Sequence, residues 1–193
     1  DELVAEIESS GGSAEALVLD VKDGAEVERE LRALDERVGG VGLVVANAGV
    51  TNGVHARALD WTAYDTVIDV NITGAAATLT ALIPKMVERG SGQLVGVSSI
   101  AGYRALPGTA AYSASKAFLS TFLEGLRIDL EPLGIHVMDV RPGFVDTPMI
   151  RGKYDHRPGV WPPERAAKRI ADDIAARRRI CRFPRGLARS AEL

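Results

Sequence analysis

Residues 41–49 of the chain read VGLVVANAG, an apolar run that ends in Asn47-Ala48-Gly49. The apolar positions are continuous and do not alternate with polar ones, which is typical of a strand buried on both faces of a sheet. The small residues after the run let the backbone approach a flat ligand closely, although they also suit an ordinary turn. We therefore predict a buried strand at Val41–Ala46, followed by a candidate binding loop.

Similar apolar runs recur along the chain, separated by segments with helical spacing. The other predicted strands are Ala16–Val21, Gln93–Ser98, Ile135–Val140 and a short edge strand, Ile180–Phe183. The predicted helices cover residues 27–38, 61–88, 112–130 and a last segment that begins at Pro162. Strands that alternate with helices and lack a polar face form a parallel sheet covered on both sides. The pattern predicts a single α/β domain over residues 1–193, with a doubly wound, mostly parallel sheet.

Composition and charge exclude several classes of protein. The chain has 193 residues, a formal net charge of -3 and a pI near 5.7, which argues against nucleic acid as the default partner. Residues 165–189 carry 9 basic and 2 acidic side chains, but Phe183 is the one aromatic residue among the arginines, fewer than a single-strand platform would need. We interpret this basic segment as the exposed face and the C-terminus of a helix.

Cysteine usage and hydropathy give expectations about location. Cys181 is the one cysteine, so an internal disulfide cannot form and a reducing, cytoplasmic location is the natural expectation. The N-terminus does not read as a signal peptide. No contiguous apolar run approaches the roughly 18 residues that a membrane span needs, so no span is expected.

The residues best suited to chemistry are Tyr112 and Lys116, which lie four apart in a predicted helix and so share one face. A free tyrosine has a pKa of about 10 and is a poor base at neutral pH. A neighbouring ammonium favours the phenolate and lowers that pKa. The pair is therefore a plausible acid/base device, with simple packing of the tyrosine as the alternative.

Two further polar residues occupy informative positions. Ser99 follows a predicted strand, where it either contacts a ligand or satisfies a loop backbone. Asn71 lies within an apolar helical stretch, in which asparagine is disfavoured. A buried amide there must satisfy neighbouring backbone, hold an ordered water, or do both.

Asp20 and the histidines are weaker candidates. Asp20 either accepts a hydrogen bond from an adenine amino group or caps the next helix. The histidines lie far apart and lack partners at metal-ligand spacing, so no metal site is predicted; they are His55, His136 and His156.

Taken in order, these features resemble the short-chain dehydrogenase/reductase family over nearly the whole chain. The matching positions are Asp20-Val21, Asn47-Ala48-Gly49, Asn71, Ser99, Tyr112-x-x-x-Lys116 and Pro142-Gly143-x-Val145-x-Thr147. Each motif alone is common, but all six in this order on alternating strands and helices are highly specific. The resemblance implies a Rossmann-type sandwich of three layers and an oxidoreductase that uses NAD or NADP.

The resemblance also implies a role for each catalytic position. Tyr112 would be the general acid in carbonyl reduction and the base in alcohol oxidation, and Lys116 would lower its pKa and bind the nicotinamide ribose. Ser99 would hold and polarise the substrate oxygen. Asn71 would hold a water that links Lys116 to solvent.

The remaining matches would contact the cofactor. Asp20 and Val21 would flank the adenine, while Asn47, Ala48 and Gly49 would lie behind the dinucleotide. The carboxamide end would meet the segment after the last long strand, namely Pro142, Gly143, Val145 and Thr147.

One element of the family pattern is missing from this sequence. The family begins with a strand, a glycine-rich turn that binds the pyrophosphate, a helix and a second strand, whereas Gly90-Ser91-Gly92 precedes a strand and is the wrong context. In the sheet order 3-2-1-4-5-6, Ala16–Val21 would reach Val41–Ala46 only through those two absent strands. We therefore expect the working protein to carry such a segment before Asp1. The choice between NAD and NADP depends on a residue in that segment.

The expected activity is hydride transfer between nicotinamide and a carbonyl/alcohol pair. The alternative is a catalytically silent binding or scaffold protein on the same fold. A lid over residues 144–161, which contains Met149, Ile150, Tyr154 and Trp161, with Leu106 opposite, suggests an apolar substrate or simply lid packing. By resemblance, a homodimer or homotetramer would form on the helices that contain Asn71 and Tyr112.

Overall fold

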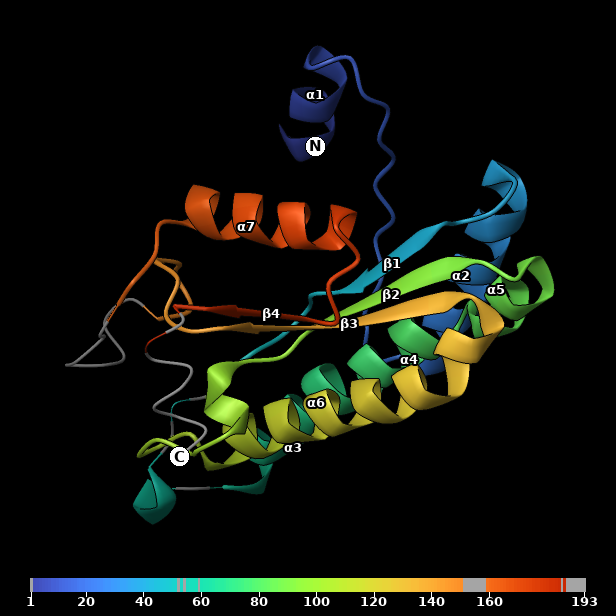
Figure 1. Cartoon of the computed structure of the whole chain (residues 1–193). Helices are drawn as coiled ribbons and strands as arrows, with labels where there is room; N and C mark the ends of the chain where they lie inside the picture. Colours follow the sequence, from blue (N-terminus) through green and yellow to red (C-terminus); the bar gives the residue numbers. More distant parts are fainter. Residues whose placement is uncertain are drawn as a thin grey trace.

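The computed structural model describes residues 2–51, 53, 55–58, 60–150, 159–184 and 186. Four parallel strands form one sheet in the order β1-β2-β3-β4 (Figure 1). The strands are β1 (Leu43–Ala46), β2 (Gly92–Val97), β3 (Ile135–Pro142) and β4 (Ile180–Phe183). In the register, Val44 pairs with Leu94 and Val95 pairs with Met138. The predicted α/β class with a parallel sheet is confirmed.

Helices cover both faces of this sheet. The α-helices are α1 (Glu2–Ser9), α2 (Gly24–Val38), α3 (Trp61–Ile68), α4 (Ala75–Thr80), α5 (Ile83–Arg89), α6 (Ala110–Leu130) and α7 (Pro163–Ala175). The short turns are η1 (Ala56–Ala58), η2 (Asp69–Gly74), η3 (Ile100–Gly102) and η4 (Glu131–Leu133). Figure 1 shows α4 and α6 below the sheet and α7 above it, which gives three layers.

The core is divided by the sheet into two clusters. Val137 of β3 packs on the α6 side, in the same cluster as Leu119 and Leu123. Met138, the next residue, packs in the second cluster, which contains Ala166 of α7. Successive strand residues point to opposite faces, so β3, with helices on both sides, places apolar residues in both clusters. The prediction that residues 41–46 are buried on both faces holds for one face of β1 only, because Val44 and Ala46 are buried whereas Leu43 and Val45 are exposed.

Local signals explain where α2 begins and ends. Asp23 is the N-cap, and its carboxylate accepts a hydrogen bond from the Glu26 amide at 2.9 Å. Gly39 follows the helix with a φ of 72°, a left-handed conformation that glycine adopts without steric cost.

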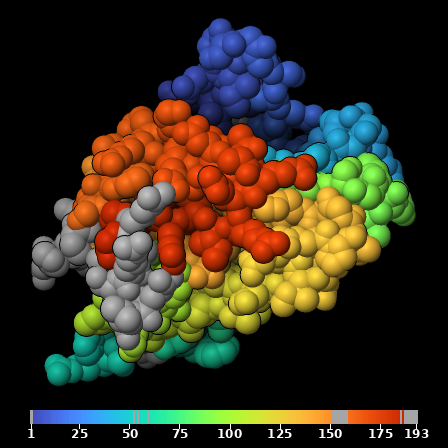
Figure 2. Space-filling model, viewed as in Figure 1, coloured from blue at the N-terminus to red at the C-terminus, as the bar shows by residue number. Residues whose placement is uncertain are grey.

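The prediction of a strand at Ala16–Val21 is wrong. This segment is irregular, and Val18 and Leu17 are exposed. No described strand lies beside it, and a strand forms only where its backbone groups find a partner. Figure 1 shows that this segment follows α1. No residue of α1 is buried, and Figures 1 and 2 show that α1 protrudes from the body of the protein.

The predicted long helix over 61–88 is confirmed, with interruptions. It consists of α3, a π-helical turn at η2, α4 and α5. Although the sequence has no contiguous apolar run of about 18 residues, Trp61–Arg89 is long and apolar enough to cross a membrane by length and composition alone. Core helices of globular proteins pass the same test, and Leu79, Leu82 and Met86 are fully buried here.

Candidate active site

The turns after β1, β2 and β3 meet at one edge of the sheet, because the carboxyl ends of parallel strands point the same way. Asn47, Ser99 and Gly143 lie in these three turns. Helix α6 packs against β3 and η3 and carries Tyr112 and Lys116 in its first two turns. The parallel topology thus gathers most of the predicted site residues.

Lys116 is a buried cation at the centre of this site. Only 5% of the residue is exposed, and its Nζ donates a hydrogen bond to the Val97 carbonyl at 2.8 Å. Burial lowers the pKa of the Lys116 ammonium to about 8, and the negative charge of Asp139 partly opposes that effect. Its Nζ lies 5.7 Å from the ring centroid of the half-buried Tyr112. The predicted pairing of these two side chains is present.

Asn71 is fully buried and connects two elements of the site. Its Oδ1 accepts the Val50 amide at 2.8 Å, and its Nδ2 donates to the Val50 carbonyl at 2.9 Å and to Ser115 Oγ at 3.0 Å. Ser115 in turn donates to the Tyr112 carbonyl at 2.7 Å. Asn71 lies in the π-helical turn η2, a distortion that occurs frequently at functional sites.

Gly49 is where the β1 turn, η2 and α6 come together. A Cβ built on Gly49 would lie 3.3 Å from Lys116 Nζ and 3.5 Å from Asn71 Oδ1. A side chain at this position would therefore crowd both polar groups. The small residues of Asn47-Ala48-Gly49 let the loop pass directly over the buried lysine and asparagine.

Ser99 holds the start of η3. Its Oγ accepts a hydrogen bond from the Ala101 amide at 3.1 Å and makes a long contact of 3.4 Å to the Pro142 carbonyl. A Cβ on Gly102, three residues later, would lie 3.0 Å from the Lys116 backbone carbon. This close approach fixes the Ser99 turn against α6, so a serine hydroxyl, a phenol and an ammonium share one edge of the site.

A small pocket lies beside this cluster, between the β1 turn and α4. Its volume is about 100 Å³, and its lining residues are Val21, Val45, Ala46, Asn47, Ala48, Gly74, Ala75 and Thr78. Gly74 permits the contact with Val21, because a Cβ there would lie 2.8 Å from the Val21 carbonyl oxygen. One cavity is therefore lined both by Val21, which was predicted to flank the adenine, and by the loop residues Asn47 and Ala48.

Asp20 lies away from the catalytic cluster. It is exposed, and its carboxylate accepts the Lys22 amide at 3.0 Å and pairs with Lys22 Nζ at 3.3 Å. The backbone hydrogen bond from Lys22 is the main cause of a lowered pKa at Asp20. The structure places it next to Val21 but does not pair it with any other predicted site residue among those described.

The segment after β3 is held at both ends. The Gly143 amide donates to the Phe183 carbonyl at 2.7 Å, and Val145 forms a parallel bridge with Trp161. Trp161 stacks on Phe183 with ring centroids 4.6 Å apart, so it packs at the base of the predicted lid. Thr147 is half-buried, and its carbonyl accepts the Ile150 amide.

Of the predicted lid residues, Met149 and Ile150 are half-buried; Leu106, which was predicted to lie opposite them, is exposed. Tyr154 lies outside the described residues, as does His156.

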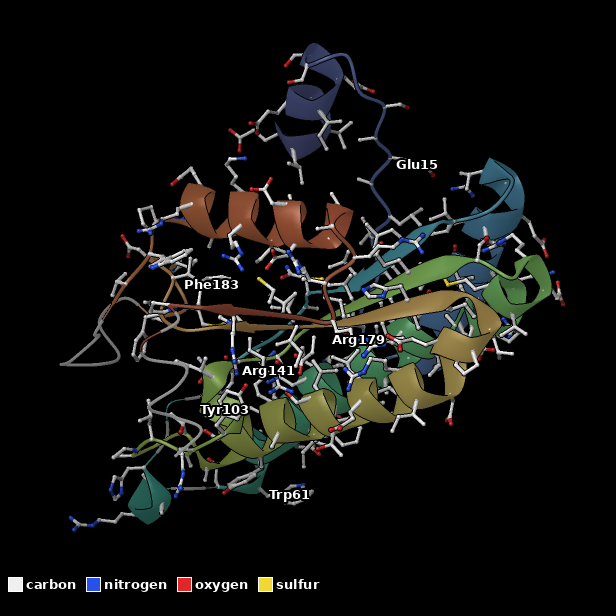
Figure 3. The ribbon with its side chains drawn as sticks, in the orientation of Figure 1. Glu15, Trp61, Tyr103, Arg141, Arg179 and Phe183 are labelled. Carbon is white, nitrogen blue, oxygen red and sulfur yellow. The ribbon has the colours of Figure 1, made fainter. Side chains whose placement is uncertain are left out.

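A polar network beside the site was missed by sequence reasoning. Asp139, in the middle of β3, is 1% exposed and accepts hydrogen bonds from Ser98 Oγ at 2.5 Å and from Arg141 Nε at 2.6 Å. Arg141 Nη1 donates to the Tyr103 hydroxyl at 2.5 Å, and Figure 3 shows Arg141 extending from β3 toward Tyr103. The signal in the sequence was an acidic residue between two apolar neighbours of a predicted strand, two positions before a basic residue.

The described residues fit a nicotinamide dinucleotide in part. The Gly49 turn is small enough for a flat group to lie against it, and the neighbouring pocket is lined by short side chains. Lys116 supplies a buried donor beside that turn. These features suit the adenine and nicotinamide ends, whereas the glycine-rich turn that would bind the pyrophosphate has no counterpart in this sequence.

Residues 1–158 match the short chain dehydrogenase family. The match covers well over half of the chain. The protein therefore belongs to the short-chain dehydrogenase/reductase family, as the sequence motifs indicated.

Curated relatives support this assignment. An uncharacterized oxidoreductase of Myxococcus xanthus is 56% identical over 141 residues, which are 72% of this chain and 55% of that protein. An uncharacterized NAD-dependent oxidoreductase of Mycobacterium tuberculosis is 41% identical over 150 residues, 77% of this chain and 54% of that protein. The chain thus spans about half the length of these relatives.

Solved structures share the fold. The gluconate 5-dehydrogenase of Burkholderia cenocepacia, in complex with NADP and tartrate, is 26% identical with a TM-score of 0.76, covering 80% of this chain and 61% of that one. A short chain dehydrogenase/reductase of Burkholderia phymatum, in complex with NAD, has a TM-score of 0.86 at 22% identity, covering 100% and 78%.

Proposed function

We propose that this chain is the catalytic part of an oxidoreductase that transfers a hydride between a nicotinamide dinucleotide and a carbonyl/alcohol pair. The observation that carries the proposal is the convergence of Lys116, Asn71 and Gly49 beside Tyr112. Membership of the short-chain dehydrogenase/reductase family supports it. The NAD-dependent name of one relative, and the NADP and NAD complexes of two structural neighbours, support NAD or NADP as the cofactor.

In this proposal, Tyr112 moves the proton. A phenol is a weak base at neutral pH, but the Lys116 ammonium lies 5.7 Å from its ring centroid and favours the phenolate. The Lys116 pKa of about 8 leaves the ammonium mostly charged at pH 7. Tyr112 therefore donates a proton to the carbonyl oxygen during reduction and accepts one from the alcohol during oxidation.

Ser99 and Asn71 orient the reacting groups. The hydroxyl of Ser99 makes only a 3.4 Å contact to the Pro142 carbonyl, so it can turn to donate to a substrate oxygen at little cost. Asn71 fixes Val50 and, through Ser115, the first turns of α6 that carry Tyr112. We retain for Asn71 the role of holding a water that links Lys116 to solvent.

The cofactor, when bound, would supply the hydride for carbonyl reduction in its reduced form and accept one from the alcohol in its oxidised form. The Lys116 ammonium would hydrogen-bond the nicotinamide ribose, and the Gly49 turn would lie against the dinucleotide. Val21 and the pocket beside it would take the adenine, with Asp20 at its rim. Gly143, Val145 and Thr147 would hold the carboxamide end.

The proposal also covers the substrate, the assembly and the location of the protein. The half-buried Met149 and Ile150 and the exposed Leu106 favour an apolar carbonyl or alcohol. A homodimer or homotetramer on the helices that contain Asn71 and Tyr112 is proposed from the family resemblance. A cytoplasmic location is proposed because Cys181, the one cysteine, is unpaired.

A Tyr112→Phe variant of the full-length protein tests the proposal. Turnover of a ketone panel should fall at least about a hundredfold, because general acid/base catalysis contributes that much or more. Fluorescence titration with reduced nicotinamide cofactor should give a dissociation constant near the wild-type value. Tyr64→Phe, which changes a half-buried tyrosine of α3, is the matched control and should leave turnover intact.

The same measurements decide the alternative of a catalytically silent scaffold. Absence of saturable cofactor binding by the wild-type protein would favour that alternative, as would binding without any turnover. Unchanged turnover in Tyr112→Phe would remove Tyr112 from the mechanism.

A further inference from the structure

Beneath the proposed site, a chain of hydrogen bonds runs between Ser98, Asp139, Arg141 and Tyr103. Asp139 is the centre of this chain, since its Oδ1 accepts a hydrogen bond from Ser98 Oγ and its Oδ2 accepts one from Arg141 Nε. Ser98 also donates to the Val140 carbonyl at 3.1 Å. The Arg141 guanidinium contacts Tyr103 twice, with its carbon 4.9 Å from the ring centroid and one nitrogen on the hydroxyl.

The network touches the proposed catalytic residues on two sides. Ser98 is flanked in the chain by Val97 and Ser99, and the Val97 carbonyl accepts a hydrogen bond from the Lys116 ammonium. Arg141 precedes Pro142, whose carbonyl is the partner of the Ser99 hydroxyl. The carboxylate of Asp139 therefore anchors both backbone segments that position Lys116 and Ser99.

A charge at this place is costly. Asp139 is 1% exposed, and the Arg141 side chain is 15% exposed, so both ions are largely removed from water. Well-packed apolar residues of similar volume are often equally or more stable than a buried ion pair. Apolar residues at both 139 and 141 would continue the run of Val137, Met138 and Val140 in β3, so the ion pair indicates a task toward the site and not only toward the fold.

The charge of Asp139 also reaches Lys116. Burial lowers the pKa of the Lys116 ammonium, and the negative charge of Asp139 opposes this effect in part. The other groups around Lys116 supply little negative charge. Tyr112 lies on the same helix as Lys116, and Arg141 is the cation paired with Asp139. The residues that face Lys116 from β2, η2 and the β1 turn are uncharged; they are Val97, Asn71 and Gly49.

We propose that Asp139 is a positioning residue of the reaction, which holds the Ser98–Ser99 turn through its hydrogen bonds with Ser98 and Arg141 and whose negative charge acts on Lys116. Arg141 and Tyr103 complete the network by balancing the buried carboxylate. This inference rests on the proposed function, because it assigns Asp139 a task toward Lys116 and Ser99. Asp139 itself exchanges no proton with the substrate.

An Asp139→Asn variant separates this role from simple packing, because it keeps the side-chain shape and an acceptor for Ser98 but removes the charge. The pKa of Lys116, followed by NMR of lysine labelled with ¹³C at Cε in the full-length protein, should fall by about one pH unit. The alkaline limb of the pH–rate profile should move to lower pH by the same amount.

Asp35→Asn is the matched control. Asp35 is also a buried carboxylate paired with an arginine, Arg89, but it bonds the Val41 amide before the start of β1, at the opposite end of that strand from the site. Both variants should lower the unfolding midpoint. Only Asp139→Asn should move the Lys116 titration and the alkaline limb.

Arg141→Gln gives a change of opposite sign. It removes the cation that offsets Asp139, so the pKa of Lys116 should rise, although this variant is destabilised as well. Ser98→Ala keeps the charge of Asp139 and should lower kcat several-fold with the alkaline limb in place. If Asp139→Asn does not fold, these two variants still test the proposal.

The outcomes are distinct. A Lys116 pKa that is the same in the wild type, Asp139→Asn and Arg141→Gln overturns the proposal, as does an equal shift in Asp35→Asn. Because the lysine titration needs no turnover, it reads out the network separately. If the wild-type protein shows no turnover, the proposed function is refuted. The lysine titration still measures how the charge of Asp139 affects Lys116.

Discussion

The Asn71→Ala substitution is the sharpest test of how the site is built. The asparagine is fully buried and makes three hydrogen bonds, two to the Val50 backbone and one to Ser115, at 2.8, 2.9 and 3.0 Å. A net value of about 1 kcal/mol for each bond gives a loss of about 3 kcal/mol in the free energy of unfolding. That is a large part of the roughly 5–15 kcal/mol by which a typical domain is stable.

Urea denaturation of the full-length protein at pH 7 measures this loss. Asn47→Ala is the matched control, because Asn47 is an exposed asparagine in the turn after β1 and should cost under about 0.5 kcal/mol. Hydrogen exchange at the Val50 amide adds a local readout, since that amide loses its acceptor only in Asn71→Ala. A loss below about 1 kcal/mol with unchanged exchange at Val50 would refute the assignment of Asn71 as the link between the β1 turn and η2.

Three further predictions follow from single residues. Burial lowers the pKa of Lys116 from its ordinary value of 10.5 to about 8 in the folded protein. Between these two pH values the unfolded state binds more protons than the folded state, so the free energy of unfolding should rise from pH 8 to pH 10.5. In Lys116→Met, urea titrations at both pH values should show less of that rise, and an equal rise would contradict the buried ammonium. Gly74→Ala should weaken binding of reduced nicotinamide cofactor at least several-fold in fluorescence titration, because the new methyl group would lie 2.8 Å from the Val21 carbonyl oxygen and push Val21 toward the pocket; Gly125→Ala, which meets no atom within 4 Å, is the control. Burial, with a smaller contribution from Asp173, raises the pKa of the Cys181 thiol to about 12, so native protein at pH 8 should react with a thiol reagent only at the rate of global unfolding. Rapid labelling of Cys181 would disprove its burial.

Much of the fold could be predicted from the sequence because hydrophobic periodicity is a local property. Strands β2 and β3 and helices α2, α6 and α7 lie within a few residues of their predicted bounds. The error at Ala16–Val21 has a different origin. Its apolar pattern suits a strand, but a strand also needs a hydrogen-bonding neighbour, and pairing is decided in three dimensions.

The candidate site shows the same division. Tyr112 and Lys116 share a helix face, so their pairing followed from spacing alone. The bonds that Asn71 makes to Val50 and Ser115 join residues 21 and 44 positions apart, and no spacing rule could predict them. The π-helical turn that presents Asn71 also could not be predicted, because it depends on packing against α6.

By itself, the sequence determined the class of fold, the family and the residue types that could move a proton. Those properties depend on local periodicity and on the chemistry of single side chains. Only the tertiary structure decided that Lys116 is buried and that Asp139 in β3 acts on its charge. The physical reason is that desolvation and Coulomb interactions depend on which atoms surround a group in space, and residues far apart in the chain supply those atoms.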